Sequence, residues 1–275
     1  GLAVGKKINY VFLETINPYT AEEIVVICAE DAVERLFSEK VTKTIEKKIN
    51  KKTKPYTIIF SCPGSDLINI KYHQLLPYLQ PLEPVDQGFR VVDADFVTTK
   101  DGTGIVHLAP TFGADDFNLA KKKGLPLMLT KDKKNNEVPI VDFEGKFVDG
   151  LGDFSGRYVK SSFGDDSEDS VDIDIVVKLK KEGLAFSSEK YEHSYPHCWR
   201  TDKPVLYYPL DSWFIQSTKC RELMIKKNKD INWKPKNTGE GRFKNWLENI
   251  NDWNLSRSRF WGIPLPIWST KSGDN

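Results

Sequence analysis

The 275-residue chain carries 40 lysines and arginines against 39 aspartates and glutamates, for a formal net charge of +1. This length is enough for one large domain or two moderate ones. Because the charges balance, any contact with nucleic acid must rest on local patches and not on bulk charge.

Cysteine usage and hydropathy exclude further classes of protein. The cysteines, Cys28, Cys62, Cys198 and Cys220, are far apart and form no CxxC pair, which favours free thiols in a reducing, cytoplasmic compartment. The longest apolar run, residues 24–29, is far shorter than the roughly 18 residues that suggest a membrane span. We therefore expect a cytoplasmic protein that has no membrane contact, and we expect it to be a monomer.

Residues 1–190 have the pattern of short strands with interspersed helices. Alternating or β-branched apolar residues predict strands at residues 8–14, 56–61, 89–98, 103–108, 127–130 and 138–147. Helical spacing and helix-end residues predict helices at residues 30–37, 117–123 and 171–184. The lysine-rich stretch at residues 42–54 has Ile45 and Ile49 as its only apolar pair, so it is typical of a solvated helix face or loop, with RNA contact as the alternative. This order of elements predicts a β-rich α+β domain.

Residues 102–117 are richer in chemistry than any other stretch. A buried strand at residues 103–108 leads into a turn marked by Pro110 and Gly113, and a helix can begin near Asp116. We expect this strand to form a hairpin with residues 89–98 that presents His107. An imidazole and a carboxylate on either side of such a turn can share a small pocket, in which the carboxylate can hold an ammonium group. A core histidine and helix-capping aspartates are the alternative.

Residues 191–275 differ in character, because all seven tryptophans lie there. Amphipathic helices are predicted at residues 218–229 and 241–250. His193, His197 and Cys198 are of the types that bind zinc, but their spacing is poor, so we expect no metal.

The stretch at residues 102–117 resembles the signature of the editing domain that is inserted into the class I isoleucyl-tRNA synthetases. His107, Ala109-Pro110 and Phe112-Gly113 point to the isoleucyl branch and not to its valyl and leucyl relatives. Further landmarks of the same family lie along nearly the whole chain: residues 64–67, 154–159, 191–200, 241–243 and 253–262.

The resemblance implies a barrel-like editing domain over residues 1–190, which lacks its N-terminal threonine-rich strand, and a connective segment over residues 191–275 that returns to the catalytic core. It assigns His107 and Asp116 to the hydrolytic site, with Asp116 on the α-ammonium group of the substrate, and Trp261 to the isoleucine pocket of the synthetic site. The substrate-binding residues that it implies are Thr103, Gly104, Ile105, Val106, Ala109, Phe112 and Asp115.

The implied function is hydrolytic editing of valyl-tRNA(Ile), with the 3′ end of tRNA(Ile) and the valine or isoleucine moiety as partners. No HIGH-type or KMSKS-type motif occurs, so we expect no aminoacylation and no cofactor here, and we assign ATP and magnesium to the parent enzyme. With its threonine-rich strand upstream of Gly1, we expect the chain alone to hydrolyse poorly. The alternatives are a module that binds the tRNA acceptor end without chemistry and, third, a generic nucleic-acid-binding domain.

Overall fold

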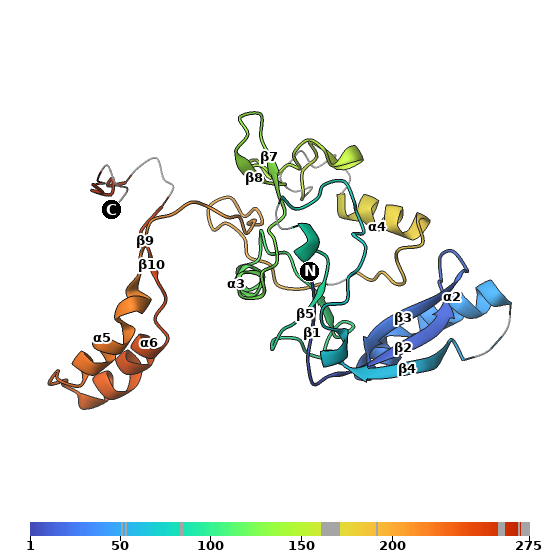
Figure 1. Cartoon of the computed structure of the whole chain (residues 1–275), viewed down its shortest axis with the longest axis horizontal. Helices are drawn as coiled ribbons and strands as arrows, with labels where there is room; N and C mark the ends of the chain where they lie inside the picture. The colour runs from blue at the N-terminus through green and yellow to red at the C-terminus, as the bar shows by residue number, and fades with distance from the viewer. Residues whose placement is uncertain are drawn as a thin grey trace. The chain divides into compact units, whose positions relative to one another are not determined.

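The computed structural model describes residues 1–50, 52, 54–82, 85–160, 171–190, 192–257, 262–268 and 270. The chain forms two compact units, Gly1–Pro209 and Leu210–Asn275, which are blue to orange and orange to red in Figure 1. The domain boundary predicted from the sequence, between residues 190 and 191, stays a prediction.

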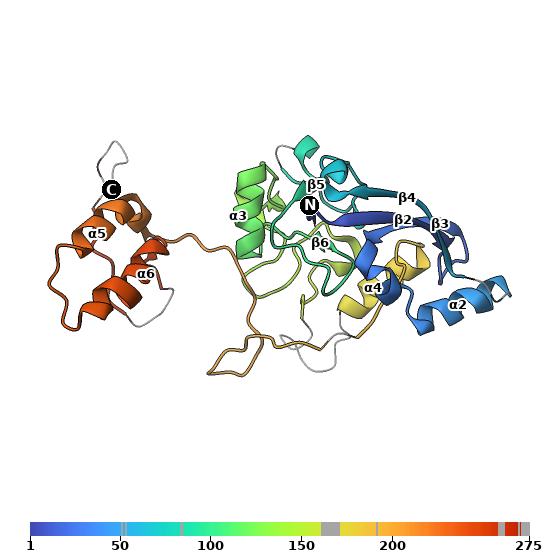
Figure 2. The same ribbon diagram turned by 90° about the horizontal axis from the view of Figure 1, so that it is seen from below.

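The longest strands of unit 1 form one antiparallel sheet in the order β3-β2-β4. In the centre, β2 (Asn9–Ile16) pairs with β3 (Glu23–Ala29) and with β4 (Tyr56–Pro63). Helix α2 (Glu39–Ile49) lies beside this sheet in both ribbon views (Figures 1 and 2). These pairings confirm the strands predicted at residues 8–14 and 56–61. The β-branched and aromatic residues of both segments suit a half-buried sheet.

The core of this part of unit 1 lies between the sheet and its helices. Tyr10, Val11 and Leu13 of β2 are buried, and so are Val41 and Ile45 of α2, within one hydrophobic cluster. The helix predicted at residues 30–37 is confirmed as a short 3-10 turn, η1 (Glu30–Ala32), continued by α1 (Val33–Leu36).

A second sheet of unit 1 has the order β5-β1-β6. The predicted hairpin of residues 89–98 with the strand that carries His107 is wrong, because β1 (Leu2–Val4) lies between the two. It pairs in parallel with β5 (Val91–Asp93) and antiparallel with β6 (Ile105–His107). A short-range turn signal cannot exclude a third strand from elsewhere in the chain, and β1 satisfies the hydrogen bonds that the hairpin would have made.

The remaining elements of unit 1 are short. They are 3-10 turns η2 (Gly64–Leu67), η3 (Val85–Gln87) and η4 (Gly152–Phe154), helices α3 (Ala114–Lys123) and α4 (Val171–Lys181), and strands β7 (Leu129–Lys131) and β8 (Glu137–Pro139). Both helices follow the sequence prediction, and α3 ends at Gly124, whose φ of 67° is the left-handed conformation that favours glycine.

The long strand predicted at residues 138–147 is largely wrong. Only β8 pairs with β7, and the chain then turns at Asp142, whose carboxylate accepts the N–H groups of Glu144 and Lys146. Gly145, with a φ of 81°, completes the turn. Asp and Gly at this spacing favour a turn, and here this preference outweighs the strand preference of the apolar residues around them.

Unit 2 is a small helical body. Strands β9 (Phe214–Ile215) and β10 (Trp253–Asn254) pair antiparallel. The helical elements are η6 (Ser217–Cys220), α5 (Arg221–Asn228), the π-helical turn η7 (Thr238–Phe243) and α6 (Lys244–Glu248). The two helices predicted in this region are confirmed.

The fold is mixed α/β, as expected, but the barrel is not found in the described part of the chain. Each sheet has two or three strands in open order, and among the described residues the two outer strands of a sheet do not pair with each other. The strands beside β1 have only three residues each, and the chain leaves the sheet after them, so the ladder cannot close into a barrel. Within the described residues, no helix is long and apolar enough to cross a membrane.

Candidate functional site

Strand β6 carries His107 along the edge of the β5-β1-β6 sheet. Leu2 is the register partner of His107, and the Leu108 N–H donates to the Gly1 carbonyl at 2.9 Å. Successive side chains of a strand point to opposite faces. Ile105 accordingly packs against the cluster around β2, whereas Val106 packs against a second cluster that includes Leu108. Two of the predicted substrate-binding residues therefore help to build the core.

The turn before β6 is held by contacts from β2 and β3. The Tyr10 hydroxyl donates to the Gly104 carbonyl at 2.7 Å and accepts from the Gly5 N–H at 3.0 Å. The Ala29 N–H donates to the Thr103 carbonyl at 2.8 Å. Gly104 has a φ of 75°, and a Cβ there would lie 2.5 Å from the Ala29 Cβ. The backbone at Thr103 and Gly104 is thus fixed by the fold.

Arg35 of α1 holds the loop that leads into this turn. Its guanidinium donates to the carbonyl oxygens of Thr99, Lys100 and Gly102, with the shortest N···O distance, 2.7 Å, to Gly102. The Thr99 hydroxyl also donates to the Asp31 carboxylate at 3.1 Å. The planar guanidinium group of arginine has several N–H donors and can reach several acceptors at once, which the single ammonium group of lysine cannot do.

Replacement of Arg35 by lysine is expected to loosen this loop, because one ammonium group cannot span three carbonyl oxygens. We expect a loss of about 1 to 2 kcal/mol in the free energy of unfolding, and faster amide hydrogen exchange at residues 99–104. Arg200→Lys, at an exposed arginine that lies over the Trp199 ring, is the control. Unchanged exchange at residues 99–104 in the Arg35 variant would contradict this role.

Asp116 lies in the first turn of α3, at the far side of the signature turn. Its Oδ2 accepts the Ala109 N–H at 2.9 Å, and no described residue donates a hydrogen bond to its Oδ1. A Cβ on Gly113 would lie 2.8 Å from Oδ2, so glycine allows this close approach. The carboxylate of Asp116 therefore closes the turn with one oxygen and leaves the other available. The neighbouring Asp115 is exposed to solvent.

His107 and Asp116 are close enough to interact electrostatically. His107 is exposed, but packed atoms beneath it displace water and lower the pKa of its imidazole. The Asp116 carboxylate opposes this effect and raises the pKa, but the effect of burial is the larger one. Since the net direction is downward from 6.5, the imidazole is neutral at pH 7 and can both donate and accept a hydrogen bond.

The rest of the turn is anchored by neighbours from later in the chain. The Thr111 hydroxyl accepts the Met128 N–H at 2.9 Å, and the Phe112 ring lies 6.1 Å from the ring of Tyr208, centroid to centroid. Among the predicted site residues, His107, Ala109 and Asp116 therefore surround one turn, whereas Ile105, Val106 and Phe112 have packing contacts.

The C-terminal end of α3 is held to the sheet by charge. The Asp93 carboxylate accepts from Lys123 at 2.6 Å and pairs with Lys6 at 3.2 Å. Arg90 donates to the Lys123 carbonyl and to the Asn69 side chain. These contacts fix the axis of α3, and hence the position of Asp116 at its other end. Asp93 could not be identified from the sequence, because its partner Lys123 lies 30 residues away along the chain.

The Asp93 interaction predicts a pH dependence of stability. The hydrogen bond from Lys123 holds the pKa of Asp93 below its usual value of 3.8. Because the folded pKa is the lower one, the stabilisation is complete above the unfolded pKa and is lost as the pH falls below about 4 towards the folded value. At pH 7, Asp93→Asn should cost about 1.5 to 3 kcal/mol.

Urea unfolding of the wild type and of Asp93→Asn at pH 7 and pH 3 measures this effect. The difference between the two proteins should shrink at pH 3. Lys6 is the matched control, since its side chain is 59% exposed, against 24% for Lys123, and Lys6→Met should change stability little. If the difference in unfolding free energy between the wild type and Asp93→Asn is the same at pH 7 and pH 3, the ionised Asp93 does not stabilise the fold.

The remaining residues singled out in the sequence are Trp261, His193, His197 and the cysteines. Trp261 lies outside the described residues. His193 and His197 contact backbone carbonyls of their own segment, and no group of three possible metal ligands occurs in the described ranges. Cys28 and Cys62 are buried, Cys220 is exposed, and the pKa of Cys28 is raised by burial to about 11, so that its thiol stays protonated.

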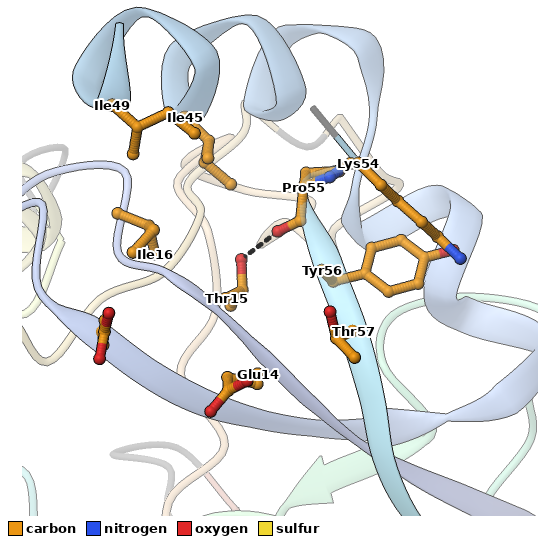
Figure 3. A pocket seen from close by; sticks show the side chains of 10 residues that line it. Glu14, Thr15, Ile16, Ile45, Ile49, Lys54, Pro55, Tyr56 and Thr57 are labelled. Carbon is orange, nitrogen blue, oxygen red and sulfur yellow. Dashed lines mark hydrogen bonds between the residues drawn. The ribbon is translucent and has the colours of Figure 1, made fainter. Parts of the chain in front are cut away.

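Two further cavities lie away from the signature turn, and none of the predicted site residues that the structure describes lines either of them. In unit 1, a cleft of about 260 Å³ lies between α2 and the ends of β2 and β4 (Figure 3). The Thr15 hydroxyl in its wall donates to the Pro55 carbonyl at 2.6 Å. In unit 2, an apolar cavity of about 520 Å³ is lined by residues that include Met224, Phe243 and Trp246.

Comparison with known proteins identifies the family. The model of the class I tRNA synthetases (I, L, M and V) matches residues 23–275. The isoleucine–tRNA ligase of Cytophaga hutchinsonii is 53% identical over 99% of this chain and 26% of that protein. The isoleucine–tRNA ligase of Bacteroides fragilis strain ATCC 25285 is 47% identical over 100% of this chain and 26% of its own length. The ligase of Clostridium tetani is 38% identical over 98% of this chain and 24% of its own length.

The chain thus spans about a quarter of the length of the curated relatives it matches. A solved structure titled "The crystal structure of GlLeuRS-CP1" aligns with 69% of this chain and 78% of its own, at 17% identity and a TM-score of 0.38. The family expected from residues 102–117 is confirmed by the match over most of the chain and by the isoleucine–tRNA ligases that cover nearly all of it. The chain belongs to the class I tRNA synthetases of the I, L, M and V group.

Proposed function

We propose that this segment is the editing part of an isoleucine–tRNA ligase and that it hydrolyses the ester of valyl-tRNA(Ile). Two observations support the proposal: the relatives that match along nearly the whole chain are named isoleucine–tRNA ligases, and His107 and Asp116 lie together at one turn. With it we propose that unit 1 has the editing fold of the Val, Ile and Leu enzymes.

The need for editing follows from the small difference between the two amino acids. One methylene in an apolar pocket changes binding by only about 1 to 3 kcal/mol, a limit for which the isoleucyl-tRNA synthetases are themselves the usual example. A second site that accepts valine and excludes isoleucine removes the wrong product. The substrate is an activated ester, so this site needs to position the substrate and a water molecule more than it needs a covalent nucleophile.

The free oxygen of Asp116 is the observation that carries the proposal. Oδ2 is fixed by the Ala109 N–H, which orients the carboxylate, and Oδ1 has no donor among the described residues. An α-ammonium group at Oδ1 would make a charge-assisted hydrogen bond, which is about twice as strong as a neutral one. This contact determines where the ester carbonyl lies. His107, neutral at pH 7, would wall the side-chain pocket or orient the terminal ribose.

The alternative is a module that binds the acceptor end of tRNA(Ile) without any chemistry of its own. Deacylation of valyl-tRNA(Ile) and affinity for tRNA(Ile), measured on the same sample of the full-length protein that carries this segment, separate the two. The proposal expects valine release that stops when Asp116 is replaced. Unchanged affinity without valine release in the wild type would support the alternative. In either case, we assign ATP and magnesium to the synthetic site of the longer protein.

A further inference from the structure

Helix α2 has one face buried and the opposite face open to solvent. Val41 and Ile45 are buried in the core cluster. Figure 3 shows Ile45 and Ile49 pointing from the helix into the cleft above β2 and β4. Residues two positions apart on a helix point to nearly opposite sides, so the positions on either side of Ile45 face away from the protein.

Those positions are occupied by lysine. Lys43 and Lys47 lie two residues before and after Ile45, and Lys40 is three residues before Lys43, so the three share one face of the helix. All three are exposed, and they span about 10 Å along the axis. Lys43 pairs with Glu39, whereas the ammonium groups of Lys40 and Lys47 have no hydrogen bond or ion pair with any described residue. We call Lys40, Lys43 and Lys47 the lysine face.

Helix stability does not account for the lysine face. Lysine near the C-terminus of a helix compensates the helix dipole, and Lys47 is in the last turn. Lys40, however, lies in the first turn, where a cation is unfavourable. The positive charge also continues beyond the helix, at the exposed Lys52 and Lys54. Residues 39–54 hold seven lysines and two glutamates, a local net charge of +5 in a chain whose net charge is +1.

We propose that the lysine face binds phosphate groups of the tRNA whose acylated end enters the site at Asp116; this inference rests on the function proposed above. A lysine ammonium group is a compact charge on a flexible stem, which suits phosphates and carries no base specificity. Helix α2 has no aromatic residue on which a base can stack. Its apolar residues are turned inward, so it lacks the exposed apolar face of a membrane-surface helix.

The test compares two triple variants of the full-length protein that carries this segment. One replaces the lysine face (Lys40→Ala, Lys43→Ala and Lys47→Ala), and alanine at exposed helix positions preserves the helix. The matched control removes the same charge from the β7–β8 hairpin, at three exposed lysines (Lys131→Ala, Lys133→Ala and Lys134→Ala). Thermal unfolding of both variants confirms that each is folded.

Affinity for uncharged tRNA(Ile) is measured by fluorescence anisotropy over a series of KCl concentrations. Each phosphate contact contributes about 0.7 to 0.9 to the slope of log affinity against log salt. The lysine-face variant should therefore have a slope that is shallower by about 2 to 3, and the control should keep the wild-type slope. Equal slopes in all three proteins would overturn the inference while leaving the editing function intact.

Two other outcomes are distinguishable. If the wild type does not bind tRNA(Ile), the proposed function fails, and the inference fails with it. If vesicles of anionic phospholipid bind the wild type but not the lysine-face variant, and the tRNA slopes are equal, the lysine face contacts membrane and not RNA, which also overturns the inference.

Discussion

Replacement of Asp116 by alanine is expected to slow hydrolysis of valyl-tRNA(Ile) by about 100-fold or more, because it removes a preorganised charge that fixes the substrate. The structure adds a second reason, since Asp116 also closes the turn through the Ala109 N–H. Loss of that hydrogen bond frees the backbone that leads from β6 into α3. Initial rates of valine release, with the full-length protein that carries this segment, measure the effect.

Two variants separate the charge of Asp116 from its structural role. Asp116→Asn keeps an acceptor for the Ala109 N–H and removes the charge, so it should hydrolyse almost as slowly as the alanine variant while keeping wild-type stability. Asp115→Ala removes the neighbouring exposed carboxylate and should keep most of the rate. A fully active Asp116→Asn variant would show that the carboxylate serves only the turn.

Replacement of Gly104 by alanine is expected to destabilise unit 1 by about 2 to 5 kcal/mol. A left-handed backbone costs a residue with a Cβ about 1 to 2 kcal/mol, and the φ of 75° places Gly104 in that region. The added Cβ would also lie 2.5 Å from the Ala29 Cβ, and overpacking of this kind costs about 1 to 3 kcal/mol. Urea unfolding gives the loss directly.

The two costs at Gly104 are separable by a second substitution. Ala29→Gly removes the methyl group that the new Cβ would meet, so the double variant should recover the overpacking cost and keep the cost of the left-handed backbone. If the double variant is as unstable as Gly104→Ala alone, the contact between these two positions does not limit what residue 104 can be.

Local signals explain which parts of the fold the sequence predicted correctly. Helix α3 was predictable because its start and stop are encoded within it, by the acidic first turn at Asp115 and Asp116 and by Gly124 at its end. The pairing of β6 was not predictable, because its partner is β1, about 100 residues away along the chain. The barrel that the resemblance implied is not formed by the described residues, because closure depends on pairing between strands that are distant in the sequence.

The candidate site also combines residues that are close in the sequence with residues that are distant in it. His107, Ala109 and Asp116 lie within one short stretch, so their proximity follows from a single turn. The residues that hold this stretch in place come from elsewhere: Tyr10 is 94 residues from Gly104, and Arg35 is 67 residues from Gly102. No periodicity or spacing in the sequence links such pairs, so only the structure could identify them.

The main proposal is that the turn at Asp116 selects valyl-tRNA(Ile) for hydrolysis. Its most direct test is a side-by-side measurement of amino-acid release from valyl-tRNA(Ile) and from isoleucyl-tRNA(Ile), in the wild type and in Asp116→Asn, with the full-length protein that carries this segment. We expect the wild type to release valine much faster than isoleucine, and we expect the variant to release both slowly. Equal release of the two amino acids by the wild type, or valine release that does not depend on Asp116, would contradict this proposal.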